Sequence, residues 1–241
     1  YFEKNNFAKI LSNSKLLLLT IATGVFLFLG MGLQQYALQV SQISNVAFIT
    51  TLYVPIVGII SRFVFKSQLH WIIWIAIVLC VFGSYLLSSN QSVEIQRSDA
   101  LIFISAFCFA FHIILIDVFM KQFNSPLAYG SIQYFIVFLI SVLVAGIYES
   151  PTLKNISIEW FEILYTGVLS AGLGYTLQII AQRKASPAPA AIILSMEGVF
   201  ATIAGWLLIN QTLDLNKFLG CIAIFTGVII VQLLPIIKKN D

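Results

Sequence analysis

The chain alternates between long apolar blocks and short polar segments. Each block contains about 20 residues, the length that an α-helix needs to cross roughly 30 Å of hydrocarbon at 1.5 Å per residue. The pattern predicts eight transmembrane helices, at residues 16–38, 43–65, 70–88, 98–121, 126–148, 159–181, 187–209 and 214–237. Membrane β-strands would be shorter and would alternate in polarity. We therefore expect an all-α integral membrane protein.

The composition agrees with this pattern. Of 241 residues, 59% are hydrophobic and 10% are charged, whereas a soluble domain has about 25% charged residues. Cys80, Cys108 and Cys221 lie inside apolar blocks, far from any metal-ligand spacing. They are interpreted as small buried hydrophobic residues. We expect no metal and no other cofactor.

The basic residues predict the orientation of the helices. If the polar N-terminal stretch is cytoplasmic, ten basic residues fall inside: Lys4, Lys9, Lys15, Arg62, Lys66, Lys121, Arg183, Lys184, Lys238 and Lys239. Three fall outside: Arg97, Lys154 and Lys217. Cytoplasmic loops are enriched in Lys and Arg. We therefore expect a multi-pass protein of the cytoplasmic (inner) membrane, with both ends of this chain in the cytoplasm.

A weak internal repeat links the first three predicted helices to the last three. An offset of 143 residues pairs Gln35 with Gln178, Gln39 with Gln182, Ala47 with Ala190 and Gln68 with Gln211, and a one-residue slip then pairs Gly83 with Gly227. Helix 16–38 would run from inside to outside and helix 159–181 in the reverse direction. The repeat is therefore inverted, an architecture found in many secondary transporters.

The repeat also predicts how the chain is organised. Two helices, 98–121 and 126–148, precede the last three, so by symmetry two helices should precede residue 16. We expect residues 1–89 to be an incomplete first repeat of three helices. Residues 98–237 would be a complete second repeat of five helices. The intact architecture would then have five plus five helices, and a start at Tyr1 rather than Met agrees with a fragment.

Several segments resemble EamA-type permeases of the drug/metabolite transporter superfamily. They are residues 30–38 (GMGLQQYAL), 45–55 (NVAFITTLYVP), 110–117 (AFHIILID), 175–182 (YTLQIIAQ) and 194–201 (LSMEGVFA). The resemblance covers essentially the whole chain, as helices three to ten of a ten-helix family. It implies two inverted halves around a central cavity and transport of metabolites, amino acids or drugs. Two positions depart from the family pattern: Gly198 replaces a Pro, and the segment 210–212 (NQT) lacks the usual Glu.

Glu197 is the foremost candidate for a functional residue. It lies near the middle of helix 187–209, where a charged side chain costs roughly 2.5–3.5 kcal/mol on insertion scales. It should therefore face protein or water. The alternative is a protonated carboxyl that a neighbouring helix satisfies. Because intramembrane acids are usually functional, we place Glu197 on a pathway for substrate or protons.

Polar residues on other helices are further pathway candidates. Gln178, Gln182 and Tyr175 share one helix face, and Gln35 lies on the equivalent helix of the first repeat. Glutamine both donates and accepts hydrogen bonds, which suits a neutral or zwitterionic solute. Hydrogen bonding between helices explains these residues equally well.

Two further candidates lie in the remaining helices. Tyr53 precedes Pro55 in the middle of helix 43–65, where a proline frees a backbone carbonyl that can line a cavity or mark a packing kink. His112 shares a stripe with Ser105 and Cys108. An intramembrane histidine is either a pathway residue or a satisfied packing residue. Both interpretations stay open for these positions.

The chain lacks the motifs of a membrane-embedded enzyme. It contains two histidines, no His-Glu-x-x-His, no Gly-x-Ser-x-Gly and no Gly-rich phosphate loop. We expect no enzymatic activity. The favoured function is a secondary transporter that works by alternating access; a channel or a non-transporting membrane sensor is the alternative. The expected partners are the lipid bilayer and a small solute, with protons and a second copy of the chain as further candidates and no nucleic acid.

Overall fold

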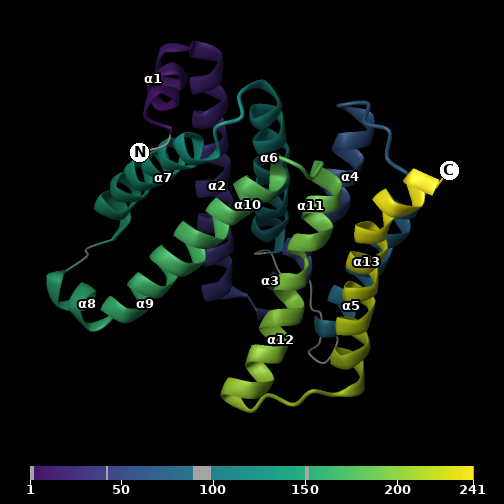
Figure 1. The fold of residues 1–241 in the computed structure, drawn as a ribbon. Coiled ribbons are helices and arrows are strands. Elements are labelled where there is room, and N and C mark those ends of the chain that lie inside the picture. Colours follow the sequence, from purple (N-terminus) through teal and green to yellow (C-terminus); the bar gives the residue numbers. More distant parts are fainter. Residues whose placement is uncertain (1–2, 42, 89–98, 150–151, 241) are drawn as a thin grey trace. The chain divides into compact units, whose positions relative to one another are not determined.

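The computed structural model describes residues 3–41, 43–88, 99–149 and 152–240 (Figure 1). Every regular element in these ranges is a helix. Eight of the described segments are long and apolar enough to cross a membrane: Ser14–Val40, Asn45–Phe63, Trp71–Ser88, Asp99–Gln122, Pro126–Tyr148, Trp160–Gln182, Pro187–Leu208 and Leu215–Leu234. The predicted all-α membrane fold is confirmed, and so is each of the eight predicted helices.

The chain forms two compact units. The first unit contains Tyr1–Phe28 and Leu115–Ala185, and the second contains Leu29–Ile114 and Ser186–Asp241. Each unit therefore takes segments from both predicted sequence repeats. The division into repeats at residues 1–89 and 98–237 stays a prediction.

The first unit is built mainly from helices of the middle of the chain. It contains α1 (Lys4–Ser12), the start of α2 (Ser14–Val40), the end of α6 (Asp99–Gln122), α7 (Pro126–Tyr148), α8 (Leu153–Ile158), α9 (Trp160–Leu164), the π-helix η1 (Tyr165–Gly174) and α10 (Tyr175–Gln182). In its core, the rings of Phe119 and Tyr129 lie 4.2 Å apart between centroids. Ile10 and Ile179 are fully buried in the same cluster.

Glu3 fixes the N-terminal segment to the start of α7. Its Oε2 atom accepts hydrogen bonds from the Ser125 hydroxyl at 2.5 Å and from the Ala128 backbone N–H at 2.8 Å. A carboxylate at a helix N-terminus satisfies free N–H groups and interacts favourably with the helix dipole. The N-terminal segment and the α6–α7 turn therefore lie on the same side of this unit, as the predicted topology requires.

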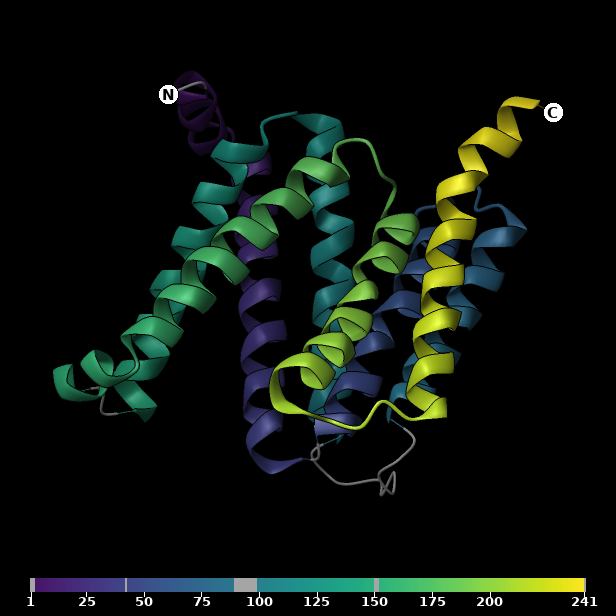
Figure 2. The same ribbon diagram turned by 60° about the horizontal axis from the view of Figure 1, so that its bottom comes forward.

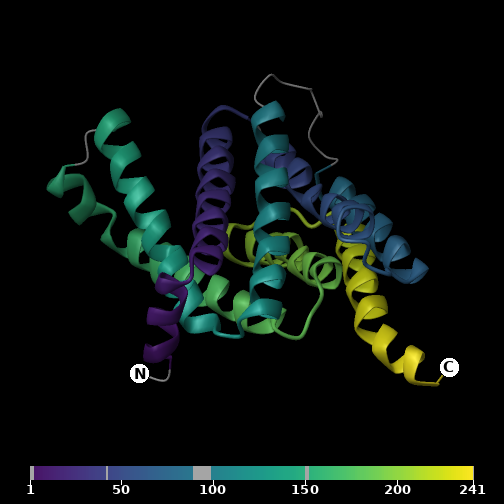
Figure 3. The same ribbon diagram turned by 90° about the horizontal axis from the view of Figure 1, so that it is seen from above.

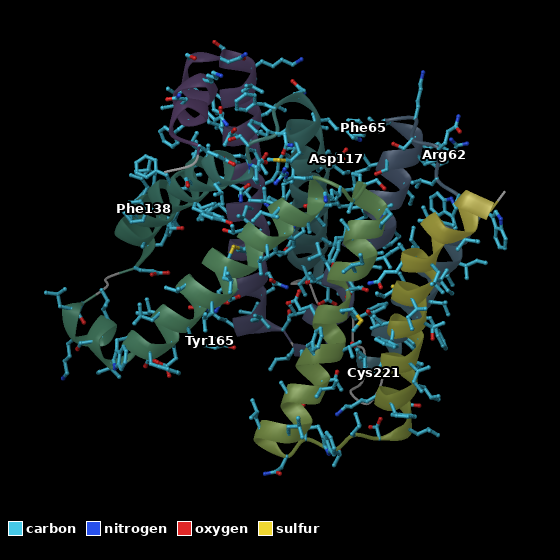
Figure 4. All side chains as sticks on the ribbon, in the orientation of Figure 1. Arg62, Phe65, Asp117, Phe138, Tyr165 and Cys221 are labelled. Atoms are coloured by element: carbon cyan, nitrogen blue, oxygen red, sulfur yellow. The ribbon has the colours of Figure 1, made fainter. Side chains whose placement is uncertain are left out.

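The last helices of the first unit form one continuous path through α9, η1 and α10. Their side chains are mostly exposed, including Tyr165, and so is Phe138 on α7 (Figure 4). Large exposed apolar side chains are expected where a helix faces lipid. Farther along the path, the Tyr134 hydroxyl lies 3.0 Å from the Thr176 hydroxyl and joins α7 to α10.

The second unit contains the remaining helices. They are the end of α2, α3 (Ile43–Thr51), α4 (Tyr53–Phe63), α5 (Trp71–Ser88), the start of α6, α11 (Pro187–Leu194), α12 (Met196–Ile209) and α13 (Leu215–Asn240). The end of α2 and the start of α6 lie side by side (Figure 3), and the Ser105 hydroxyl donates to the Gly30 carbonyl at 2.7 Å.

Two predicted membrane helices of the second unit are each divided by one tight turn. The first turn is at Leu52, between α3 and α4, with φ −60° and ψ −12°. The second is at Ser195, between α11 and α12, with φ −62° and ψ −13°. The two residues are separated by 143 positions, which is the offset of the sequence repeat. The repeat therefore extends to the backbone conformation.

The two turns have different chemical causes. Pro55 has no N–H to donate to the carbonyl of Thr51, which interrupts the helix ladder at Leu52. At the second turn there is no proline. There the Ser195 hydroxyl donates to the Ile192 carbonyl at 2.6 Å, and such a bond within the helix bends it. The missing proline at Gly198 therefore does not remove the turn.

The ends of α4 and α12 share a second, less common geometry. Lys66 and Asn210 both have positive φ, 50° and 52°, a conformation that costs free energy for a side-chain-bearing residue. The Ser67 N–H then donates to the Ser61 carbonyl at 2.9 Å, and the Gln211 N–H donates to the Gly205 carbonyl at 3.1 Å.

These caps set the local register of the repeat. The offset between the two caps is 144 residues, so Gln68 corresponds to Thr212. The sequence pairing of Gln68 with Gln211 is therefore wrong by one residue.

Helices α5 and α13 pack side by side in opposite directions (Figure 2). A Cβ atom at Gly83 would lie 2.7 Å from the Gly220 carbonyl oxygen and 2.7 Å from Ile224. A Cβ atom at Gly227 would lie 3.1 Å from the Ala76 carbonyl oxygen and 3.2 Å from the sulfur of Cys80.

These two sets of contacts are related by the repeat. An offset of 144 carries Ala76, Cys80 and Gly83 onto Gly220, Ile224 and Gly227. The repeat therefore carries the contact of Gly83 with α13 onto the contact of Gly227 with α5. Since the two equivalent helices run in opposite directions, the repeat within this unit is inverted.

Candidate functional site

The second unit contains a cavity of about 500 Å³ between α3 and α12, which we call the α3–α12 crevice. Ile43, Ala47 and Thr51 line it from α3, and Ser84, Leu87 and Ser88 from α5. The α12 side is formed largely by small residues: Gly198, Ala201, Ala204 and Gly205. Small side chains leave the space open and would also let the two helices approach each other closely.

The polar lining of the α3–α12 crevice is mostly hydroxyl groups. Those of Thr51, Thr202 and Ser88 each donate their proton to a carbonyl four residues earlier in their own helix, at 2.9, 2.8 and 3.1 Å. With the proton used in this way, the lone pairs of each oxygen remain as acceptors. This part of the crevice therefore suits a ligand that carries N–H or O–H donors.

A positively charged side chain, that of Lys217, lies at the mouth of the α3–α12 crevice. Lys217, at the start of α13, lines the cavity with Gln211 and Thr212. Its ammonium group donates to the Thr212 carbonyl at 2.9 Å, and its backbone N–H donates to the Asp214 carboxylate at 2.9 Å. Two further protons of the ammonium remain for other acceptors. The mouth therefore favours an anionic or dipolar group.

The repeat supplies a counterpart of this crevice, formed by α4 and α11, and that counterpart is closed. The Tyr53 hydroxyl donates to the Ala191 carbonyl at 3.4 Å. Helix α4 packs directly against α11. Arg62 lies in the last turn of α4, and Phe65 follows the end of that helix (Figure 4). The same pair of repeated segments is therefore packed in one copy and separated in the other.

Equivalent residues differ in burial as this arrangement requires. Val57 is 0% exposed, whereas its counterpart Phe200 is 65% exposed. Ala190 is buried, whereas its counterpart Ala47 is exposed. The two copies therefore form the same helices and turns but bury equivalent positions differently.

Glu197 lies on α12 beside the crevice, two residues after the turn at Ser195. Its side chain is exposed. Its carboxyl group forms no hydrogen bond and no ion pair with any described residue. The ion pair found among the described residues joins Lys121 to Asp117. Its counterpart in the closed copy is Val54, which is 0% exposed.

The other predicted residues of the second unit differ in environment. Tyr53 is buried and holds α4 to α11, as described above. His112 is 1% exposed, within α6. Gln35 is exposed on α2. The structure thus places Tyr53 in the closed contact, whereas Gln35 is accessible.

The predicted residues of the first unit lie on α10. The Gln178 side-chain N–H donates to the Gln182 side-chain oxygen at 3.2 Å, one helical turn away. Gln182 is buried, and Gln178 and Tyr175 are half-buried. The predicted shared face of Gln178 and Gln182 is therefore present, and part of their hydrogen-bonding capacity is used within the helix.

The sequence interpretation missed the residues that line the crevice. Thr51, Ser88 and Thr202 were not distinguished from other hydroxyl residues in apolar blocks, and Lys217 was counted only for topology. One sequence signal was available, because the departure from the family pattern at residues 210–212 lies in the segment that leads to Lys217. Which hydroxyls share a cavity depends on helix rotation, which residue spacing alone did not determine.

These features define the class: a multi-pass α-helical membrane protein with an internal inverted repeat and a crevice in one copy of it. The sequence model of the EamA-like transporter family matches residues 2–89 and 96–233. The chain belongs to this family of membrane transporters, and the resemblance seen in the sequence is confirmed.

Two relatives carry names that agree with the family. One is an "Uncharacterized transporter" of Archaeoglobus fulgidus, 28% identical over 210 residues, covering 87% of this chain and 67% of the relative. The other is the "Uncharacterized transporter YwfM" of Bacillus subtilis, 27% identical over 176 residues, covering 69% of this chain. The chain spans 56% of the length of the Bacillus protein.

A solved structure shares the fold. It is titled "Crystal structure of protein" and matches with a TM-score of 0.78 at 12% identity, over 94% of this chain and 79% of that chain. At 12% identity, the match shows a shared fold alone.

Proposed function

We propose that this chain forms eight helices of a secondary transporter that moves small metabolites, amino acids or drugs across the cytoplasmic membrane by alternating access. The supporting observation is that the α4–α11 contact is closed while its repeat counterpart, the α3–α12 crevice, is open. Two copies of one structural element can exchange conformations, so that the open copy closes and the closed copy opens. Rocking of inverted repeats around a site is a known basis of alternating access.

The chemistry of the crevice narrows the solute. Hydroxyl acceptors inside it and the Lys217 ammonium at its mouth suit a small dipolar solute, with its donor end inward. In the orientation predicted from the basic residues, the crevice opens to the outside. The proposed pathway residues remain Tyr175, Gln178, Gln182, Gln35, Tyr53 and His112, and Glu197 is considered below.

Cross-linking tests the proposed gating. In the full-length protein without native cysteines, Phe48→Cys and Met196→Cys stand where the closed copy has Ala191 and Tyr53, which are in contact. Oxidation of the double variant should hold the crevice closed and abolish uptake by reconstituted vesicles, and a reducing agent should restore uptake. The two single-cysteine variants are the matched controls. Full uptake by the cross-linked double variant would refute the proposed gating.

An exchange experiment separates a carrier from a channel. Unlabelled solute inside the vesicles should accelerate uptake of labelled solute, because a carrier returns faster when it is loaded. A channel gives no such acceleration. Candidate amino acids and small metabolites are screened first with the full-length protein, and no uptake of any of them under a proton or sodium gradient would count against transport.

A further inference from the structure

The exchange of conformations between the two copies has a consequence for Glu197. An offset of 143 carries Leu52, Tyr53 and Val54 onto Ser195, Met196 and Glu197. The turns at Leu52 and Ser195 have nearly the same φ and ψ, so the residues that follow them occupy equivalent positions. When the α3–α12 crevice closes, Glu197 takes the environment that Val54 has now.

That environment excludes solvent. Val54 is 0% exposed, and so is Val57 one turn later. The closed copy carries an apolar residue at this position, and the open copy carries a carboxyl group. An ionised carboxylate that is moved into such a site loses its hydration and needs a compensating charge.

Among the described residues, the elements packed against α12 supply no such charge at this depth. α11 and α3 contain no titratable residue, and α5 contains Cys80 and Tyr85. α13 contains Cys221, and Lys238 and Lys239 lie at the far end of that helix. Lys217 lies at the mouth of the crevice and bonds to the Thr212 carbonyl.

We propose that Glu197 is a coupling site, at which a single positive charge must bind before the α3–α12 crevice can close. This proposal rests on the proposed function, because closure is a step of the transport cycle. The charge comes from a proton or from the ammonium group of the solute, and both have the same effect on the carboxylate. An unoccupied, ionised Glu197 keeps the crevice open.

The proposal predicts how closure of the α3–α12 crevice depends on pH. Lowering the pH protonates Glu197 and shifts the equilibrium toward the closed crevice. A glutamine at this position is permanently neutral, so closure should become independent of pH. A valine, the residue of the closed copy, should favour closure most strongly.

Accessibility of a cysteine in the crevice measures closure without relying on transport. Ala47→Cys lines the crevice and is exposed in the open state, and its counterpart Ala190 is buried. It is introduced into full-length protein in which all native cysteines are replaced. Labelling by a membrane-impermeant maleimide is compared with that of free cysteine at each pH, which corrects for reagent chemistry.

We expect labelling of the Glu197 parent to slow, relative to free cysteine, as the pH falls from 8 to 5.5. Glu197→Gln and Glu197→Val should label at least about tenfold more slowly at pH 8 than the parent and should not respond to pH. Glu197→Asp should retain the pH response. This result would show that the protein tolerates a substitution at position 197. Glu149→Gln, an exposed carboxyl at the end of α7, is the matched control and should behave as the parent.

Methylammonium chloride at pH 8, with sodium chloride as the salt control, distinguishes the two sources of charge. Slower labelling of the parent but not of Glu197→Gln supports binding of an ammonium group. A response to pH alone supports the proton. Equal pH responses in the parent and in Glu197→Gln would overturn the proposal, as would labelling that is fast in every variant. Failure of the parent to transport any solute would instead count against the proposed function.

Discussion

Small residues at four positions set how closely α5 and α13 approach each other: Ala76, Gly83, Gly220 and Gly227. A helix pair in a membrane gains little from hydrophobic association, because lipid is as apolar as leucine, so close backbone contact matters more. Gly83 and Gly220 each leave 2.7 Å between a would-be Cβ and the carbonyl oxygen of the other. Real Cβ atoms do not approach backbone so closely. The small side chains at these positions are therefore a requirement of the crossing.

Gly83→Ala tests this requirement. The added methyl group would force the two helices apart, and we expect a loss of about 1–3 kcal/mol of stability, typical of overpacking. The measurement is the thermal midpoint of the detergent-solubilised protein, followed by size-exclusion chromatography after heating. Gly32→Ala on α2, where a Cβ meets no atom within 4 Å, is the control and should be neutral or slightly stabilising. Equal midpoints for both variants would contradict the close contact.

At the scale of elements, the sequence predicted each membrane helix to within a few residues but not its internal turns. The apolar blocks carry the length signal directly. Pro55 marked a kink near Leu52. The turn at Ser195 has no proline, and a hydroxyl bond to a carbonyl of the same helix also occurs where a helix is unbroken, as at Thr202. The crevice could not be predicted either, because the repeat aligns α3 with α11, while the structure gives the two helices different packing partners. The predicted roles of Gln35, Gln178 and His112 stay untested.

Tyr53→Phe tests the closed contact between α4 and α11. The variant loses the hydrogen bond to the Ala191 carbonyl, which is worth about 0.5–1.5 kcal/mol, so the open form of this contact should become about 2–10-fold more populated. Ser61→Cys reports it, since Ser61 is buried and its counterpart Gly205 lines the open crevice. Its labelling rate should rise by that factor. Tyr36→Phe, exposed on α2, is the control, and an unchanged rate in Tyr53→Phe would contradict a gating role.

At the scale of the whole molecule, the two units give separate support to one topology. In the first unit, Glu3 joins the N-terminal segment to the α6–α7 turn, just after Lys121. In the second unit, α5 and α13 run in opposite directions, so the start of α5, after Lys66, lies at the same end as the C-terminus of α13. Both arrangements group basic residues that the charge rule places together. The side of the membrane on which these groups lie is still predicted from charge.

Single-cysteine labelling decides that side. In full-length protein without native cysteines, Lys66→Cys, Lys121→Cys and Lys184→Cys should resist an impermeant maleimide in sealed cells and should react once the cells are permeabilised. Lys154→Cys should react in sealed cells, and so should Glu94→Cys, which lies outside the described residues. The cysteine-free parent gives the background. The reason is energetic: the excess of Lys and Arg, ten against three by the assignment above, is retained on the cytoplasmic side during insertion. Reaction of Lys121→Cys in sealed cells would reverse the orientation and make the α3–α12 crevice open to the cytoplasm.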